Sequence, residues 1–226
     1  MYYGPGSGIG LTLRWFQNRK PLRVAVVGLG AGVLSAYAQR GHAYRYYEIN
    51  PAVISFATDP SEHFAFRFLY DATRRGAAMF VVPGDARRMM EKDLSTGAVG
   101  AGSFDVLAID AFSSDAIPVH LLTSEAFDLY RKMIRPGGVI AAHITNRYFD
   151  LAPLFFRLAE RAGLKAVHIV APPDKEHGIA RSSWVLITDN VRFLSDPALK
   201  DKAVPPPGER PRIWTDNYSH LFDALK

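Results

Sequence analysis

Several acidic side chains stand where predicted strands end, so they could act together on one bound molecule. Glu48 closes a run of aromatic residues, Asp110 follows an apolar run, and Asp85 and Asp115 lie in loops beyond such runs. In an open α/β sheet, ligands bind outside the carboxyl ends of the strands. Carboxylates at that edge can accept hydrogen bonds from sugar hydroxyls or from amines.

A glycine-rich turn precedes these acids. Gly28, Gly30 and Gly32 follow the apolar run 24–27 with the spacing G-x-G-x-G, and Val33 stands where the dinucleotide pattern G-x-G-x-x-G has its last glycine. Such a turn lets a ligand lie against bare backbone at the end of a parallel strand. The spacing favours S-adenosylmethionine or a related nucleoside over NAD.

The order of the turn and the acids points to a nucleoside. Glu48 follows Gly28 by about 20 residues, a spacing at which an acid suits the two hydroxyls of a ribose. The corner Gly84-Asp85-Ala86 offers amides and a carboxylate to an adenine edge, and Asp110 begins a long polar loop. Together these residues predict a nucleoside site with a reacting group beside it.

Each candidate also has a plain structural interpretation. Asp85 or Asp115 could simply cap the helix that follows, because Asp is a preferred N-cap residue. Glu48 fits this interpretation less well, since Asn50-Pro51 already supplies a helix start. His143, at the end of a later strand, is expected to be a packed, hydrogen-bonded histidine rather than a base.

Strand and helix patterns alternate from residue 23 onward and would position these residues. This order predicts an α/β fold: a doubly wound, mostly parallel sheet with helices on both faces and an antiparallel pair at one edge. The predicted strands are 24–27, 43–48, 78–82, 104–109, 139–144, 164–170 and 182–188, and the predicted helices are 32–40, 51–58, 87–94, 124–134 and 151–162.

The organisation predicted from these patterns is one nucleoside-binding catalytic domain with two appendages. Residues 23–190 form the core domain, residues 1–22 lead into it, and residues 191–226 form a C-terminal extension that packs on the same domain. A chain of 226 residues is a suitable length for one α/β domain.

Composition narrows the function classes. The chain has no cysteine, which excludes disulfides, thiol catalysis and cysteine-ligated zinc, and no metal is expected. It carries a net charge of +5, but its cations are dispersed, so nucleic-acid binding is not expected. No apolar run approaches the ~20 residues of a membrane span, and the start shows no secretory signal. A cytoplasmic location is expected.

These features resemble the polyamine aminopropyltransferases, the spermidine synthase family, and in particular the spermidine synthase-like domains that are fused to membrane segments in bacteria. The resemblance runs from about residue 2 to 222. It rests on the segments Val27–Gly32, Tyr47–Pro51, Gly84–Arg87, Phe104–Pro118, Leu122–Phe127, Arg135–Gly138 and Trp214–Ser219. The segment from Asp110 to Thr123 is the most specific of them.

The resemblance implies a fold, a chemistry and a set of roles. The fold would be the Rossmann-like fold of class I S-adenosylmethionine-dependent methyltransferases, and the protein would be a homodimer. Asp110 would orient or deprotonate an attacking amine, with Asp115 as the second catalytic acid. Substrate contacts would come from Asp115, Asp216 and Tyr218, and nucleoside contacts from Gly28, Gly30, Gly32, Glu48, Asp85 and Ala86.

The chain departs from the family pattern at two places. Family members usually have an aspartate at the position of Ala31, where it holds the amine of decarboxylated S-adenosylmethionine. Family members also usually carry a small β-strand domain before the core, and this sequence starts at Tyr2-Tyr3-Gly4, where that domain is expected to have ended already.

Three alternative functions are compatible with these residues and with the resemblance. The leading one is a spermidine synthase-like transfer of an aminopropyl group from decarboxylated S-adenosylmethionine to a polyamine such as putrescine. An S-adenosylmethionine-dependent methyltransferase is the second, favoured by Ala31. The third is a nucleoside-binding domain without catalysis, because fold alone does not decide function.

Overall fold

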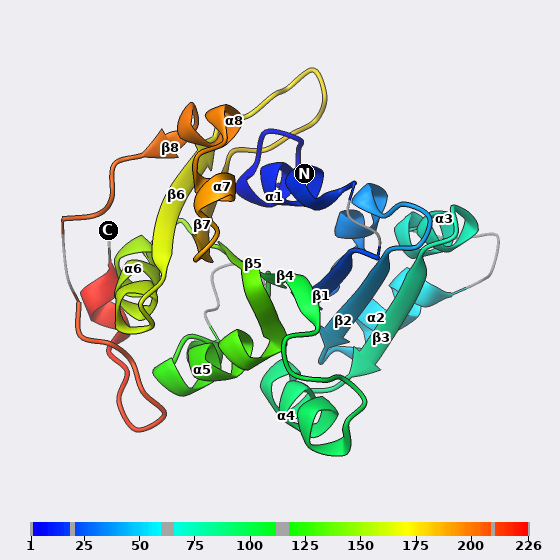
Figure 1. Cartoon of the computed structure of the whole chain (residues 1–226), viewed down its shortest axis with the longest axis horizontal. Helices are drawn as coiled ribbons and strands as arrows, with labels where there is room; N and C mark the ends of the chain where they lie inside the picture. Colours follow the sequence, from blue (N-terminus) through cyan, green and yellow to red (C-terminus); the bar gives the residue numbers. More distant parts are fainter. Residues whose placement is uncertain (1, 19–20, 60–65, 112–117, 209–210, 226) are drawn as a thin grey trace.

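A single mixed β-sheet organises the chain (Figure 1). The structure is a computed structural model and describes residues 2–18, 21–59, 66–111, 118–208 and 211–225. Within them, eight strands lie in the order β3-β2-β1-β4-β5-β7-β6-β8. Their bounds are β1 Arg23–Val27, β2 Ala43–Glu48, β3 Ala78–Pro83, β4 Phe104–Ile109, β5 Ile134–His143, β6 Lys165–Ala171, β7 Ser182–Thr188 and β8 Ala203–Val204.

The sheet is parallel from β3 to β5 and antiparallel beyond it. Strand β1 pairs in parallel with both β2 and β4, and β4 pairs in parallel with β5. Strand β7 runs antiparallel to β5 and β6, and the short β8 is added outside β6. The predicted doubly wound sheet with an antiparallel edge is confirmed, and the carboxyl ends of β1, β2 and β4 meet at one edge.

Successive apolar side chains of β1 point to opposite faces of the sheet, so each face has its own hydrophobic core. Val24 and Val26 pack toward α1, η1 and α3, whereas Ala25 and Val27 pack toward α4, α5 and α6. The helices are α1 Gly8–Phe16, α2 Pro51–Thr58, α3 Phe68–Arg74, α4 Ala86–Thr96, α5 Ser124–Met133, α6 Ala152–Arg161, α7 Val191–Leu194 and α8 Pro197–Lys200, with the 3-10 turns η1 Val33–Tyr37, η2 Val119–Leu121 and η3 Leu221–Ala224.

The helix predicted over 32–40 is wrong. The structure forms only the short 3-10 turn η1, and the chain becomes extended at Ala38. The guanidinium of Arg75 donates to the carbonyl oxygens of Ser35 and Ala38, at 2.9 and 3.2 Å. A side chain from α3 thus satisfies carbonyls that a longer helix would satisfy from within.

The segment Pro136-Gly-Gly does not simply separate α5 from a later strand. Helix α5 ends at Met133, one residue before its predicted end, and β5 begins at once, at Ile134, and includes these residues. The pairing register between β4 and β5 shifts between Phe104 and Val106, where β5 begins directly after α5. The strand still ends at His143, one residue before the predicted end.

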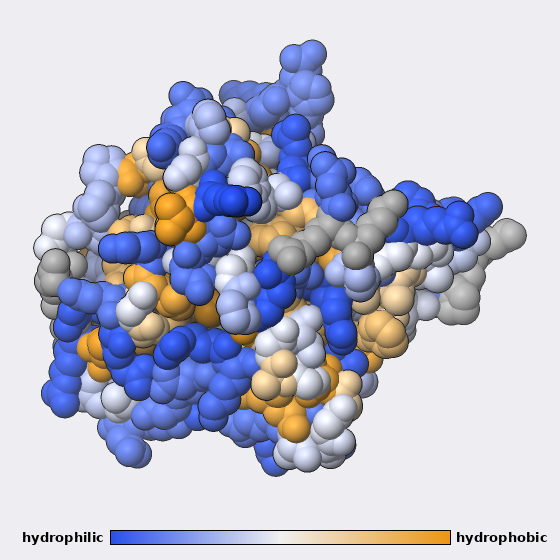
Figure 2. All heavy atoms as spheres, in the orientation of Figure 1, coloured by the Kyte–Doolittle hydropathy of each residue, from blue (hydrophilic) through white to orange (hydrophobic). Residues whose placement is uncertain are grey.

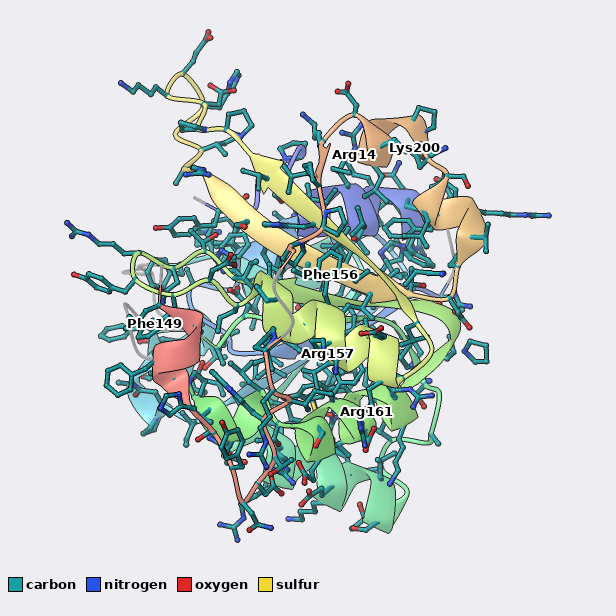
Figure 3. The ribbon with its side chains drawn as sticks, turned by 90° about the vertical axis from the view of Figure 1, so that its left-hand side faces the viewer. Arg14, Phe149, Phe156, Arg157, Arg161 and Lys200 are labelled. Atoms are coloured by element: carbon teal, nitrogen blue, oxygen red, sulfur yellow. The ribbon has the colours of Figure 1, made fainter. Side chains whose placement is uncertain are left out.

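The C-terminal segment returns to the core domain. Trp214 is buried in the cluster formed with α5 and α6. In the side view, η3 lies beside Phe149, and Arg157 and Arg161 project from α6 (Figure 3). The amide of Asp150 donates to the carbonyl of Ala224 at 2.7 Å, which joins the chain end to the start of α6.

The surface shown in Figure 2 is mostly hydrophilic, with apolar patches separated by polar residues. Separated patches are normal for a folded chain, because apolar atoms always make up much of the accessible surface. Among the described residues, no helix combines the length and the apolar character needed to span a membrane.

Candidate functional site

The glycine turn lies at the carboxyl end of β1, directly beside the end of β4. Gly28 has a φ of +93°, and a β-carbon built there would lie 2.5 Å from the carbonyl oxygen of Asp110. Gly30 also has a positive φ, +50°, but its β-carbon would meet no atom within 4 Å. Gly28 therefore permits a close backbone approach, and Gly30 leaves open space against which a ligand can lie.

Glu48 ties the turn to the end of β2. One carboxylate oxygen accepts from the amide of Leu29 at 2.9 Å, and the other accepts from the amide of Asn50 at 2.8 Å. The side chain is nearly buried. Because each carboxylate oxygen can accept two hydrogen bonds, Glu48 can hold this backbone and still accept from a ribose diol.

Asp110 lies at the centre of a polar cluster. Its Oδ1 is 2.7 Å from Nδ1 of His143, and it also accepts a hydrogen bond from the Tyr3 hydroxyl. Burial, reinforced by the charge of Asp110, raises the pKa of Tyr3 well above that of an ordinary phenol. Tyr3 thus stays protonated and donates to the carboxylate.

The sequence did not reveal the role of Tyr3. Tyr3 and Asp110 are more than a hundred positions apart, and no spacing pattern links them. The ring of Tyr3 also lies 6.1 Å from that of His143 and 6.3 Å from that of Trp184, while its carbonyl accepts from the hydroxyl of Tyr37 at 2.6 Å. These contacts bring the N-terminal segment to the candidate reacting carboxylate.

Asp110 and the glycine turn together line a small cavity. About 20 Å³ is open to the centre of a water-sized sphere, which is room for about one water. Asp110, Tyr3 and Tyr46 supply its polar groups, and Ala31 forms part of its wall. The remaining lining is Val26, Gly28, Leu29, Val33 and Leu34.

Asp85 caps helix α4 and pairs with His120. Its Oδ1 accepts from the amide of Arg88 at 3.0 Å, and its Oδ2 is 2.8 Å from Nε2 of His120. Burial opposes ionisation of Asp85, but these two partners outweigh it and hold its pKa below the ordinary value. Ala86 follows as the first, buried residue of α4. Capping and ligand binding are therefore compatible at Asp85.

Asp216 is joined to the first turn of α4 through Arg87. It forms two hydrogen bonds of 2.6 Å with Arg87 and accepts from the hydroxyl of Thr123 at 2.8 Å. Tyr218 lies under Arg212, whose guanidinium carbon is 3.9 Å from the ring centroid. These contacts hold the C-terminal segment against α4 and α5, so the carboxylate of Asp216 already has protein partners.

Some expected features remain without a test. Asp115 lies outside the described residues, so the structure does not place the predicted second acid. Gly32 is described: it precedes η1 with a φ of +74°, and Leu69 fills the space where its β-carbon would be. Its role in the structure is therefore packing against α3.

Within the described part of the chain, no His, Asp and Glu side chains form a cluster suited to a metal ion.

Comparison with known proteins gives one curated relative. No protein-family model matches the chain. A polyamine aminopropyltransferase from Vibrio vulnificus (strain CMCP6) is 32% identical over 139 residues, covering 59% of this chain and 42% of the relative. The chain thus spans less than half the length of that relative.

Solved structures share the fold. A probable spermidine synthase from Corynebacterium glutamicum aligns with a TM-score of 0.55 and 18% identity, covering 80% of this chain and 61% of the other. The O-methyltransferase TomG from Streptomyces achromogenes, solved in complex with SAM, gives 0.52 and 15%, covering 79% and 77%. Over part of its length the chain is therefore similar in sequence to a polyamine aminopropyltransferase, and it has a Rossmann-like fold of the class I methyltransferase type.

Proposed function

We propose that this chain is an aminopropyltransferase that moves an aminopropyl group from decarboxylated S-adenosylmethionine to an aliphatic amine such as putrescine. The observation that carries the proposal is the position of Asp110. Its backbone touches Gly28 of the glycine turn, and its carboxylate lines the same small cavity as that turn. A carboxylate is therefore next to the place where a nucleoside sulfonium would lie.

Asp110 would serve the amine that attacks. An alkylamine is mostly protonated near pH 7 and lacks a free lone pair. A carboxylate can hold the ammonium, accept its proton and aim the nitrogen at the carbon bonded to sulfur. A C–N bond then forms while the C–S bond breaks, and its electron pair returns to sulfur. The leaving group is neutral methylthioadenosine, so no acid is needed to assist it.

The donor would lie along the ends of β1, β2 and β3. Gly30 offers bare backbone with open space, Glu48 has acceptor capacity for the ribose hydroxyls, and Asp85 with Ala86 borders the adenine edge. Both substrates are cations while the chain has a net positive charge, so binding depends on this local group of acids.

A second candidate is methyl transfer from intact S-adenosylmethionine. The observation that favours it is Ala31, whose methyl side chain lines the same cavity as Asp110. No carboxylate stands at that position to hold the amine of an aminopropyl group. The TomG neighbour was solved in complex with SAM on the same fold.

Product analysis separates the two candidates. The chain is incubated with putrescine and either donor, and the nucleoside product is identified by mass spectrometry. Methylthioadenosine from decarboxylated S-adenosylmethionine supports the proposal, whereas S-adenosylhomocysteine from the intact donor supports the second candidate. If neither donor raises the melting temperature of the chain, both enzyme functions fail.

A further inference from the structure

Asp110 belongs to a chain of hydrogen bonds that continues behind the candidate site. His143 Nδ1 lies 2.7 Å from Asp110 Oδ1, and His143 Nε2 lies 2.7 Å from Oγ1 of Thr145. The same Oγ1 accepts from the amide of Ser183 on β7 at 2.8 Å. The side chains of Asp110 and His143 are 12% and 8% exposed, so water competes little for these bonds.

The chemistry of the groups determines where the protons lie. An ionised Asp110 can only accept, so Nδ1 of His143 must carry a hydrogen. A ring with its one hydrogen on Nδ1 accepts at Nε2, where the hydroxyl of Thr145 can donate. Since Thr145 Oγ1 already accepts from the backbone of β7, its hydrogen is free to point at the ring. The carboxylate of Asp110 thus selects the tautomer of His143, and the Thr145 hydroxyl, which is anchored to the backbone of β7, complements it at Nε2.

Packing fixes the plane of the same ring. His143 stacks on Trp184, with ring centroids 4.6 Å apart and an interplanar angle of 14°. Trp184 is fully buried on β7. Tyr2 and Tyr3 cover the other surroundings of the ring, with centroids 5.4 and 6.1 Å away. Stacking on Trp184 and hydrogen bonds at both nitrogens give the His143 ring one orientation, in which Nδ1–H points at Asp110.

We propose that His143 is a positioning residue that aims the carboxylate of Asp110 at the acceptor amine. This inference rests on the proposed function. The bond from Nδ1–H occupies Oδ1 and stops the carboxylate from rotating, which leaves lone pairs of Asp110 directed at the site. His143 itself neither touches the amine nor takes its proton; that proton goes to Asp110.

Two amide variants of His143 distinguish the hydrogen bond made by Nδ1 from the one made by Nε2. In His143→Asn the amide lies near the position of Nδ1 and can still donate to Asp110. In His143→Gln the longer side chain places its amide near the position of Nε2, so it can reach Thr145 but not Asp110. Both amides are polar and uncharged, which makes each variant the control for the other.

The kinetic test compares kcat, KM and donor affinity. We expect His143→Gln to lower kcat on the order of 100-fold, because a misaligned catalytic group costs about that much. His143→Asn should recover most of the loss, and the Kd for the nucleoside donor should stay within about twofold in both. Equal kcat in wild type and His143→Gln would overturn the inference, as would loss of kcat in both variants to the same extent.

A second readout does not depend on turnover or on a variant that folds. Nitrogen-15 NMR of the wild-type imidazoles at pH 8 reports which nitrogen of His143 is protonated. Protonated Nδ1 supports the inference, and unprotonated Nδ1 overturns it. If wild type transfers no group from either donor, the proposed function fails, and this spectrum still shows whether His143 donates to Asp110. The two failures are therefore distinguishable.

Discussion

Gly28 and Asp110 approach so closely that a β-carbon on Gly28 would lie 2.5 Å from the carbonyl oxygen of Asp110. They end β1 and β4, which are parallel neighbours, and the amide of Asp110 donates to the carbonyl of Val27 at 2.9 Å. The glycine turn and the candidate reacting acid are therefore one structural unit. A substitution in the glycine turn should therefore change the position of the Asp110 carboxylate.

Substitution of Gly28 should damage the fold more than substitution of Gly30. Both have a positive φ, which costs an alanine about 1–2 kcal/mol. Only Gly28→Ala adds a clash with backbone, so its free energy of unfolding in urea should fall further. Gly30→Ala projects into open space and should weaken nucleoside binding instead. Equal stability of the two variants would contradict the close approach.

Glu48 should matter for stability as well as for binding. Glu48→Ala leaves the amides of Leu29 and Asn50 without their acceptor, and at the buried Leu29 amide the unsatisfied donor costs about 1–3 kcal/mol. Glu48→Gln keeps one amide oxygen as an acceptor and should lose less. Hydrogen exchange of the Leu29 amide tests the bond itself, since that amide should exchange faster in Glu48→Ala than in the wild type. Unchanged exchange would contradict it.

Substitutions of Asp110 and Asp85 should have different effects, the first on the rate of transfer and the second on donor binding. Asp110→Asn keeps the size of the side chain but cannot accept the amine proton, so we expect kcat to fall by about 10²–10⁴-fold with the donor Kd preserved. Asp85→Asn should raise the donor Kd with a smaller effect on kcat. Steady-state kinetics and calorimetric titration measure the two quantities. Full turnover in Asp110→Asn would refute its proposed role.

Ala31 is the position at which donor choice should respond. Ala31→Asp places a carboxylate in the cavity wall, where it can hold the amine of decarboxylated S-adenosylmethionine. A charge-assisted hydrogen bond contributes about 1.5–3 kcal/mol, so the Kd for that donor should improve by about 10–100-fold relative to the intact donor. Ala31→Asn is the control for size. An equal change for both donors would show that this position does not select between them.

The Arg87–Asp216 pair should make stability depend on pH in the acid range. The hydrogen bond from Arg87 is the main cause that holds the pKa of Asp216 below its ordinary value. The folded state therefore gains stability above about pH 4, the ordinary range for Asp, and loses it as the pH falls through the lowered pKa. Asp216→Asn should flatten this part of a plot of unfolding free energy against pH.

Arg87→Met supplies the matching control, because it removes the partner and leaves the carboxylate. It should erase the same pH-dependent part, and the double variant should lose no more of it than either single variant does. A full acid slope in Asp216→Asn would show that other carboxylates cause it. Since the pair is partly exposed, added salt should also weaken its effect.

Local sequence patterns predicted most of the sheet. Strands β2, β4 and β7 and helix α2 have the bounds that their residues predict, because alternating or continuous apolar character and turn residues act within a few positions. The predicted helix over 32–40 failed because Arg75, from α3, binds the carbonyls of Ser35 and Ala38. A contact between residues that far apart leaves no periodic signal.

By itself, the sequence determined the ends of β1, β2 and β4, the glycine turn and the acids that follow them, since hydrophobic periodicity and turn chemistry are short-range properties. Only the tertiary structure decided that Tyr3 and His143 bind Asp110 and that Asp216 is paired with Arg87. Strand order and side-chain packing bring these residues together from distant parts of the chain. Their partners follow from the three-dimensional arrangement of the sheet, which no local spacing encodes.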